Sequence, residues 1–156
     1  MKIILAAALV VIAGQAQALS CLRADVARTF GWASEAEERY VVLQGAFTFS
    51  SPAKDLTDMN DRQSVRLPAT CSGQYLGADG FVAAPTLDVT LRFECFGPWC
   101  GSIENNEDTL AFVEQTADGY VLNVDPCFST VFAPNDANVQ SVLSCMRGTG
   151  CEEPAF

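Results

Sequence analysis

The chain has 156 residues, no histidine, and nineteen acidic against nine basic side chains, which gives a net charge of −10. This charge repels nucleic acids and anionic lipids, because both bind to basic patches. It would suit cations or a basic partner surface, although solubility alone is the simpler explanation. Without histidine, Ser-His-Asp and Cys-His catalysis and histidine metal sites are excluded.

The first residues have the pattern of a secretion signal. Lys2 precedes an apolar run at 3–13, and residues 16–18 form an A-x-A cleavage site. The run is shorter than the about 20 residues that cross a membrane, and no later segment reaches that length. We therefore predict a signal peptide at 1–18 and a single domain at 19–156, exported to the periplasm or out of the cell.

A helix and a strand are expected first in the exported part. Leu22, Val26 and Phe30 recur every four residues, which predicts a helix over 20–38. Period-2 alternation then predicts a strand over 40–49. Gly45 takes an inward position in it, which is typical of a bulge or of the sharp bend that closes a small barrel.

Four further strands follow by the same alternation, at 64–76, from residue 86 to Cys95, at 110–113 and at 120–124. Pro68 cannot donate to a sheet, so the strand over 64–76 is expected to be an edge or to be interrupted there. The side chains predicted to face the core are Val41, Leu43, Phe47, Phe49, Val65, Leu67, Tyr75, Leu87, Val89, Leu91 and Phe93.

A second helix is expected near the end of the sequence. Asn135 is a good N-cap and Gly148 a good terminator, and Val139, Val142, Leu143 and Met146 form one stripe between them. Helix, five strands and helix predict a mostly β (α+β) fold, which is most economically a small five-stranded OB-like barrel. A flat two-layer sheet with helices on one face is the alternative.

All seven cysteines lie after the predicted cleavage site, which predicts a disulfide framework made in an oxidising compartment. Structural zinc is the other common use of cysteine, but the chain has no histidine and no C-x2-C pair, so no metal site is predicted. Only a short turn separates Cys95 from Cys100 and Cys145 from Cys151, which favours these two local bridges. By elimination, Cys21 is expected to join Cys127.

Because the cysteine count is odd, at least one cysteine is free, modified or joined to another chain. Cys71 lies in mid-strand on the apolar face, so we predict that it is a free, buried thiol. Lipidation of Cys21 is the alternative, since it would leave an even set of six. However, Gln17 and Ala18 stand where a lipoprotein signal normally carries an apolar residue, usually leucine, so ordinary cleavage is expected.

The arrangement resembles the netrin-module and tissue-inhibitor-of-metalloproteinase-like secreted OB-folds. Two features carry the resemblance: Cys21 ahead of a helix and the strand at 40–45, and the late strand at 119–124 that leads into Cys127. The chain is also similar to small exported bacterial proteins of unassigned function. The resemblance implies the fold and an inhibitor-like binding role. The inhibitors begin at a Cys-x-Cys that chelates zinc, whereas position 23 here is arginine, and two residues are expected to precede Cys21 after cleavage.

Three other sequence motifs are candidate sites. Ser51 and Lys54 match S-x-x-K, but the S-D-N and K-T-G strings that accompany it in serine acyltransferases are missing. Trp99 and Cys100 resemble a thioredoxin-type site, but the acidic residues that follow would raise a thiolate's pKa, which favours a structural clip. The acidic loops, at Asp55, Asp58 and Asp61 and at 104–108, offer weak calcium binding as the alternative to solvated loops.

No catalytic residue and no cofactor are therefore predicted. We expect an exported, non-enzymatic binding or envelope-associated module, whose partner is an unknown protein or envelope component. The alternative is a periplasmic thiol-disulfide protein that works through Cys95 and Cys100.

Overall fold

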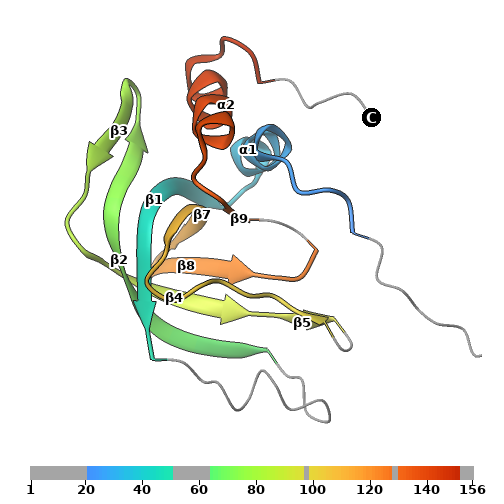
Figure 1. The fold of residues 1–156 in the computed structure, drawn as a ribbon, viewed down its shortest axis with the longest axis vertical. Helices are drawn as coiled ribbons and strands as arrows, with labels where there is room; N and C mark the ends of the chain where they lie inside the picture. Colours follow the sequence, from blue (N-terminus) through green and yellow to red (C-terminus); the bar gives the residue numbers. More distant parts are fainter. Residues whose placement is uncertain (1–20, 51–63, 97–98, 128–129, 152–156) are drawn as a thin grey trace, which may run out of the picture.

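The computed structural model describes residues 21–50, 64–96, 99–127 and 130–151 (Figure 1). The predicted signal peptide, Ser51, Lys54, Asp55, Asp58 and Asp61 lie outside these ranges. The elements in chain order are α1 (Val26–Glu35), β1 (Arg39–Phe49), β2 (Val65–Gly77), β3 (Gly80–Ala83), β4 (Leu87–Phe93), β5 (Cys95–Phe96), β6 (Trp99–Cys100), β7 (Asp108–Thr116), β8 (Gly119–Val124), β9 (Val131–Phe132) and α2 (Asp136–Arg147).

Five strands close into a barrel in the order β1-β2-β4-β8-β7, and β7 pairs again with β1. All neighbours are antiparallel except β4 and β8, which run parallel. β1 closes the barrel because residues 39–46 pair with β7 while 43–49 pair with β2. The mostly β, OB-like barrel with a helix near each end is therefore confirmed, and the flat two-layer sheet is wrong.

The barrel interior follows the predicted alternation in most strands. Leu43, Phe47, Val89, Leu91 and Phe93 are buried, and most of the other inward residues are half-buried against them. Tyr75 is the exception, because its side chain is 42% exposed. β2 pairs with β4 only over residues 65–71, and beyond Gly73 it runs on into a hairpin with β3, so the barrel wall that would cover Tyr75 has ended.

Two glycines allow the tight coiling of β1 against β2. A Cβ at Gly45 would lie 2.3 Å from the carbonyl oxygen of Ser72, and one at Gly73 would lie 2.1 Å from that of Gln44. Gly45 therefore serves a close approach of two strands. Pro68 pairs with Thr90 of β4, and the pairing of β2 with β1 begins only at Ala69, so β2 has a partner strand on one side at Pro68. The strand is nevertheless neither an edge of the barrel nor interrupted there, in contrast to the expectation.

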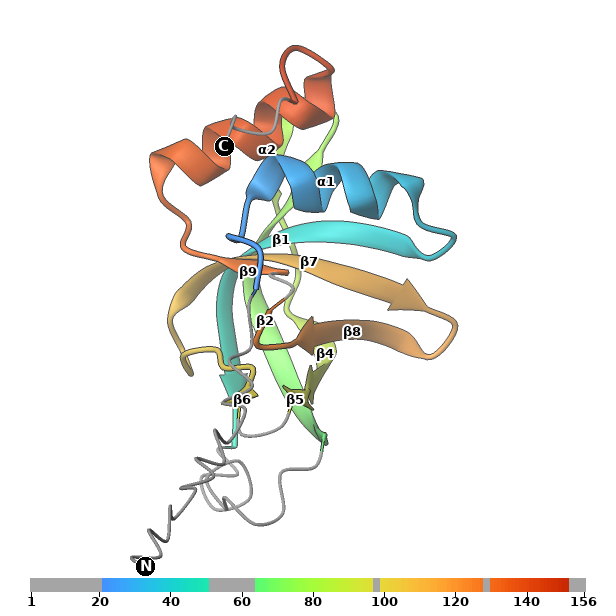
Figure 2. The ribbon, with the colours of Figure 1, turned by 90° about the vertical axis from the view of Figure 1, so that its right-hand side faces the viewer.

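The two helices lie together over the outside of β1 and β7 (Figure 2). They bury a second apolar cluster, in which Val26 of α1 and Val142 of α2 meet Val42, Leu110 and Phe112 of the barrel wall. Val42 lies between the inward residues Val41 and Leu43, so strict alternation would turn it to the outer face of the barrel. That face is apolar here because the helices, and not water, cover it.

α1 is shorter than predicted, because it begins at Val26 and not at residue 20. Asp25 is the N-cap, and its side chain accepts a hydrogen bond from the Arg28 N–H at 2.9 Å. Leu22 therefore lies before the helix and is 69% exposed, although the sequence pattern placed it on the buried stripe.

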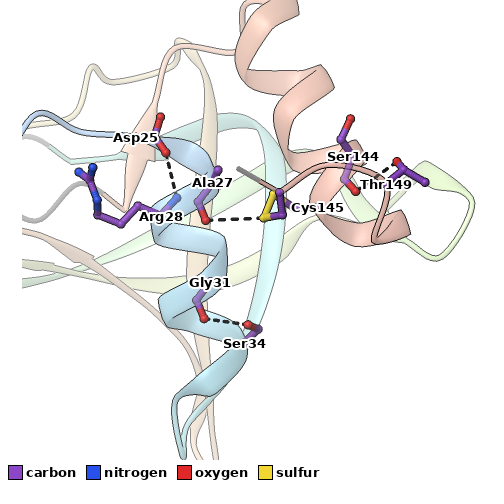
Figure 3. The surroundings of a disulfide bond; sticks show 9 residues. Asp25, Ala27, Arg28, Gly31, Ser34, Ser144, Cys145 and Thr149 are labelled. Carbon is purple, nitrogen blue, oxygen red and sulfur yellow. Dashed lines mark hydrogen bonds between the residues drawn. A yellow bond between two sulfur atoms is a disulfide. The ribbon is translucent and has the colours of Figure 1, made fainter. Parts of the chain in front are cut away.

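α2 has the caps that the sequence predicts, Asn135 at its start and Gly148 in the left-handed conformation at φ 66° at its end. Its buried residues are Val142 and Cys145, whereas Met146 is 40% exposed, so its predicted place on the buried stripe is wrong. The disulfide from Cys145 to Cys151 packs against α1, with the Cys151 Sγ 3.8 Å from the carbonyl oxygen of Ala27 (Figure 3).

Three disulfides are typical of proteins in an oxidising compartment outside the cytoplasm. Neither of the helices in the described ranges is long and apolar enough to cross a membrane.

Candidate functional site

The cysteines divide into three bridges and one thiol. The disulfides are Cys21–Cys127, Cys95–Cys100 and Cys145–Cys151, the same pairs that the sequence favours. Cys71 is free and 3% exposed inside the barrel. Burial raises the pKa of its thiol to about 11, and the carboxylate of Asp108 adds to the rise. A thiol in this position is inert under neutral conditions.

Two of the disulfides lie at a pocket with a volume of about 470 Å³. We call it the clip pocket. Its walls come from the segment before α1, from β6 and the residues after it, and from the end of β8 with the approach to β9. In Figure 2 the dark-blue segment before α1 runs beside β9, which brings these distant parts of the chain to one side of the barrel.

The β5–β6 hairpin forms one wall of the clip pocket. Cys95 faces Cys100 and Phe96 faces Trp99 across two very short strands. Gly101 then packs against β8 so closely that a Cβ would lie 2.0 Å from the carbonyl oxygen of Val124. The Gly101 N–H also donates to the carbonyl of Glu94 at 2.9 Å, which ties the hairpin back to the end of β4.

The floor of the clip pocket is buried and hydrogen-bonded. Val124 belongs to the barrel core and also lines the pocket. The Thr130 hydroxyl donates to the carbonyl of Asn123, and the Phe112 N–H donates to the Thr130 carbonyl at 2.9 Å. Asp125 accepts a hydrogen bond from the Cys127 N–H at 2.8 Å. These bonds hold the floor in one arrangement, so the pocket belongs to the folded framework.

Large apolar side chains stand exposed at the edge of this pocket. Leu22 is 69% exposed and Trp99 is 42% exposed, and both line it. Phe96, the cross-strand neighbour of Trp99, is 44% exposed. Aromatic and aliphatic side chains that gather in this way beside a concavity are typical of protein-binding surfaces.

A second pocket, of about 400 Å³, adjoins the first, because Ser102 and Val131 line both. We call it the acidic pocket, since Glu104, Glu107 and Asp108 line it and all three are exposed. Val131, Phe132 and Pro134 supply its apolar side. The two pockets are therefore neighbours, and together we call them the depression, which is apolar at the Trp99 end and acidic at the other.

The acidic turn at 104–108 is held to the end of β1 by hydrogen bonds. The Asn105 side chain accepts from the Phe49 N–H at 3.1 Å and donates to the Phe49 carbonyl at 3.0 Å, so it pairs with the end of β1 as a strand would. Asn106 adopts φ 63° beside it. Within the described ranges, no three Asp, Glu, Cys or His side chains converge closely enough to hold a metal ion.

The predicted redox alternative lies at the clip pocket too. Cys100 lines the pocket, but the Cys95–Cys100 bridge joins two strands of a hairpin and does not stand at a helix start. Helix N-termini lower a cysteine's pKa in known disulfide oxidoreductases, and the described part of this hairpin lacks one.

Sequence reasoning missed most of this site. It assigned Leu22 to a helix and considered Trp99 only as part of a redox string. The sequence does not indicate that Ser102 and Val131 line a pocket. They do so only because β9 pairs with β7 and because the 21–25 segment forms another wall. Exposed aromatics beside a cysteine-closed turn are the one clue in the sequence.

Comparison with known protein families, curated proteins and solved structures found no match for this chain.

Proposed function

We propose that the protein is an exported, non-enzymatic binding module that holds a partner protein of the cell envelope or medium at the clip pocket. Export rests on the predicted signal peptide at 1–18 and on the three disulfides. The partner rests on a different observation, which is the exposure of Leu22 and Trp99 at one pocket, with exposed Phe96 paired to Trp99.

That observation carries the proposal because exposing large apolar side chains is unfavourable unless something covers them. The two disulfides at the pocket hold these side chains in place in the free protein. A preorganised surface loses less conformational entropy on binding, which favours a recognition role. The described ranges offer no comparable argument for a reaction.

Affinity capture from the native envelope or culture medium, with the exported protein as bait, tests the proposal. The informative variant is Leu22→Ser with Trp99→Ala. Its matched control is Tyr75→Ser with Val82→Ser, which removes two side chains of similar exposure, 42% and 47%, that do not line the clip pocket. We expect the first variant to lose the captured partner and the control to keep it. Equal retention by both variants contradicts the proposal.

The thiol-disulfide alternative is favoured by one fact, that Cys100 lines the pocket. The reduction potential of the Cys95–Cys100 pair separates the two functions. A potential near those of known disulfide oxidants would support the alternative, whereas resistance to millimolar reductant supports the binding module.

A further inference from the structure

We propose that the occupant of the depression is an extended, basic segment of a partner protein. One large apolar side chain of this segment lies beside Leu22 and Trp99, and its lysine or arginine side chains lie over the acidic pocket. This inference rests on the proposed function and specifies the chemistry of the partner. It commits to a peptide segment, because an extended chain can reach both of two neighbouring pockets, which share Ser102 and Val131.

Charge complementarity gives the sign of the partner. The residues that line the two pockets include four carboxylates, Asp125, Glu104, Glu107 and Asp108, and no lysine or arginine. Glu104, Glu107 and Asp108 form no ion pair with any described residue. Three of the four carboxylates line the acidic pocket, so this pocket supplies most of the attraction.

A metal ion is a poorer occupant than a basic side chain. Ion binding needs several carboxylates that converge on one point, and no such group occurs among the described residues. Asn105, which follows Glu104 in the turn, is already bonded to β1 through both its oxygen and its nitrogen. Carboxylates spread along a groove instead suit the spaced cations of an extended chain.

The apolar end gives the anchor. Trp99 and Leu22 face one pocket from two different parts of the chain, which the Cys21–Cys127 and Cys95–Cys100 bridges hold in place. An aliphatic side chain placed between them would be shielded from water on both sides. At protein interfaces a central apolar contact usually supplies the affinity, and the charged contacts beside it fix the orientation.

A set of three synthetic peptides tests the inference. The first has one leucine followed by alternating lysine and serine, the second has glutamate in place of each lysine, and the third has serine in place of the leucine. The chain has two tryptophans, so Trp32→Phe leaves Trp99 as the single fluorescent reporter in the pocket. Titration of this variant measures each affinity directly.

We expect the lysine peptide to bind on the order of tenfold more tightly than the glutamate peptide, and the leucine-free peptide to be weakened as well. Neutralising the groove by Glu104→Gln, Glu107→Gln and Asp108→Asn should weaken the lysine peptide by about tenfold. The matched control is Glu35→Gln, Glu37→Gln and Glu38→Gln, which changes the net charge equally at residues outside both pockets. It should weaken binding by less than about twofold.

Equal affinity for the lysine and glutamate peptides overturns the inference, and so does equal weakening by the two triple variants. The captured partner distinguishes this failure from that of the proposed function. If the partner is lost by Leu22→Ser with Trp99→Ala but kept by the Glu104→Gln, Glu107→Gln and Asp108→Asn variant, the result supports the binding module and contradicts only the preference for a basic partner.

Discussion

The barrel interior and the clip pocket share Val124, yet they are held together in different ways. The interior is enclosed by strands of 6 to 13 residues and by side chains with almost no exposure. The pocket is built on three two-residue strands, β5, β6 and β9, and on two disulfides. Apolar burial stabilises the first region, whereas covalent links stabilise the second, so the two should respond to different substitutions.

Removal of the long-range disulfide should have the largest effect. The Cys21–Cys127 bridge joins residues 106 positions apart, so Cys21→Ser with Cys127→Ser is expected to lower the free energy of unfolding by about 5 kcal/mol in the chain-entropy description. Urea unfolding at neutral pH measures the loss.

The control for this prediction is Cys95→Ser with Cys100→Ser. That bridge spans only 5 positions, so about 2 kcal/mol is expected. Equal losses in the two double variants would contradict the view that the long-range link holds the 21–25 segment on the barrel.

Substitution in the barrel interior comes next. Phe47 is fully buried, so Phe47→Ala should cost about 3 to 5 kcal/mol through lost burial and the cavity left behind. Phe96 has the same side chain but is 44% exposed at the pocket edge, and Phe96→Ala should change the free energy of unfolding by about 0.5 kcal/mol or less. If Phe96→Ala proves as costly as Phe47→Ala, the two regions do not differ as described.

The sequence predicts the interior well, because alternation carries the information wherever one strand face is dry. It fails at particular places for physical reasons. Tyr75 follows the inward pattern but lies beyond the part of β2 that faces β4, and Val42 interrupts the polar face because the two helices cover it. The local sequence pattern predicts the period of a strand, but it does not predict where the neighbouring strands end.

The pocket was beyond such reasoning, because it has no periodicity of its own. Leu22 sits at helical spacing from Val26, but Asp25 starts the helix later and the bridge to Cys127 holds Leu22 outside it. The pairings of the cysteines followed from loop length, whereas the concavity between them depends on how β9 meets β7. Only the three-dimensional arrangement supplies that contact.

Alkaline pH should lower the free energy of unfolding through the buried thiol of Cys71. Burial, with Asp108, raises the pKa of Cys71 from 9.0 to about 11 in the folded protein. Because the native state keeps a proton that the unfolded state loses, this contribution to stability is complete below pH 9 and is lost as the pH rises through 11. The full loss is about 2 to 3 kcal/mol.

Thiolate absorbance in the far ultraviolet, taken as the difference between the native protein and Cys71→Ala, measures this pKa. Denaturant unfolding of the same pair gives the stability: the wild type should lose more than Cys71→Ala above pH 9, although burial and nearby carboxylates also raise the pKa of Tyr40 in both proteins. A thiol that titrates near its ordinary value would show that water reaches the barrel interior at Cys71.

The smallest effect is expected at Asn105, in the acidic turn that is hydrogen-bonded to the end of β1. Its side chain makes two hydrogen bonds to Phe49, one as acceptor and one as donor, at an exposed position. Asn105→Ala should therefore cost about 1 kcal/mol, and Asn105→Asp about half of that, because aspartate can still accept from the Phe49 N–H but cannot donate to its carbonyl. Thermal unfolding with and without calcium measures both effects.

If the 104–108 turn were a calcium site, Asn105→Asp would add a ligand, and calcium would raise the melting temperature of this variant above that of the wild type. We expect no such rise, because the oxygen of residue 105 is turned toward β1 and not toward Glu104, Glu107 and Asp108.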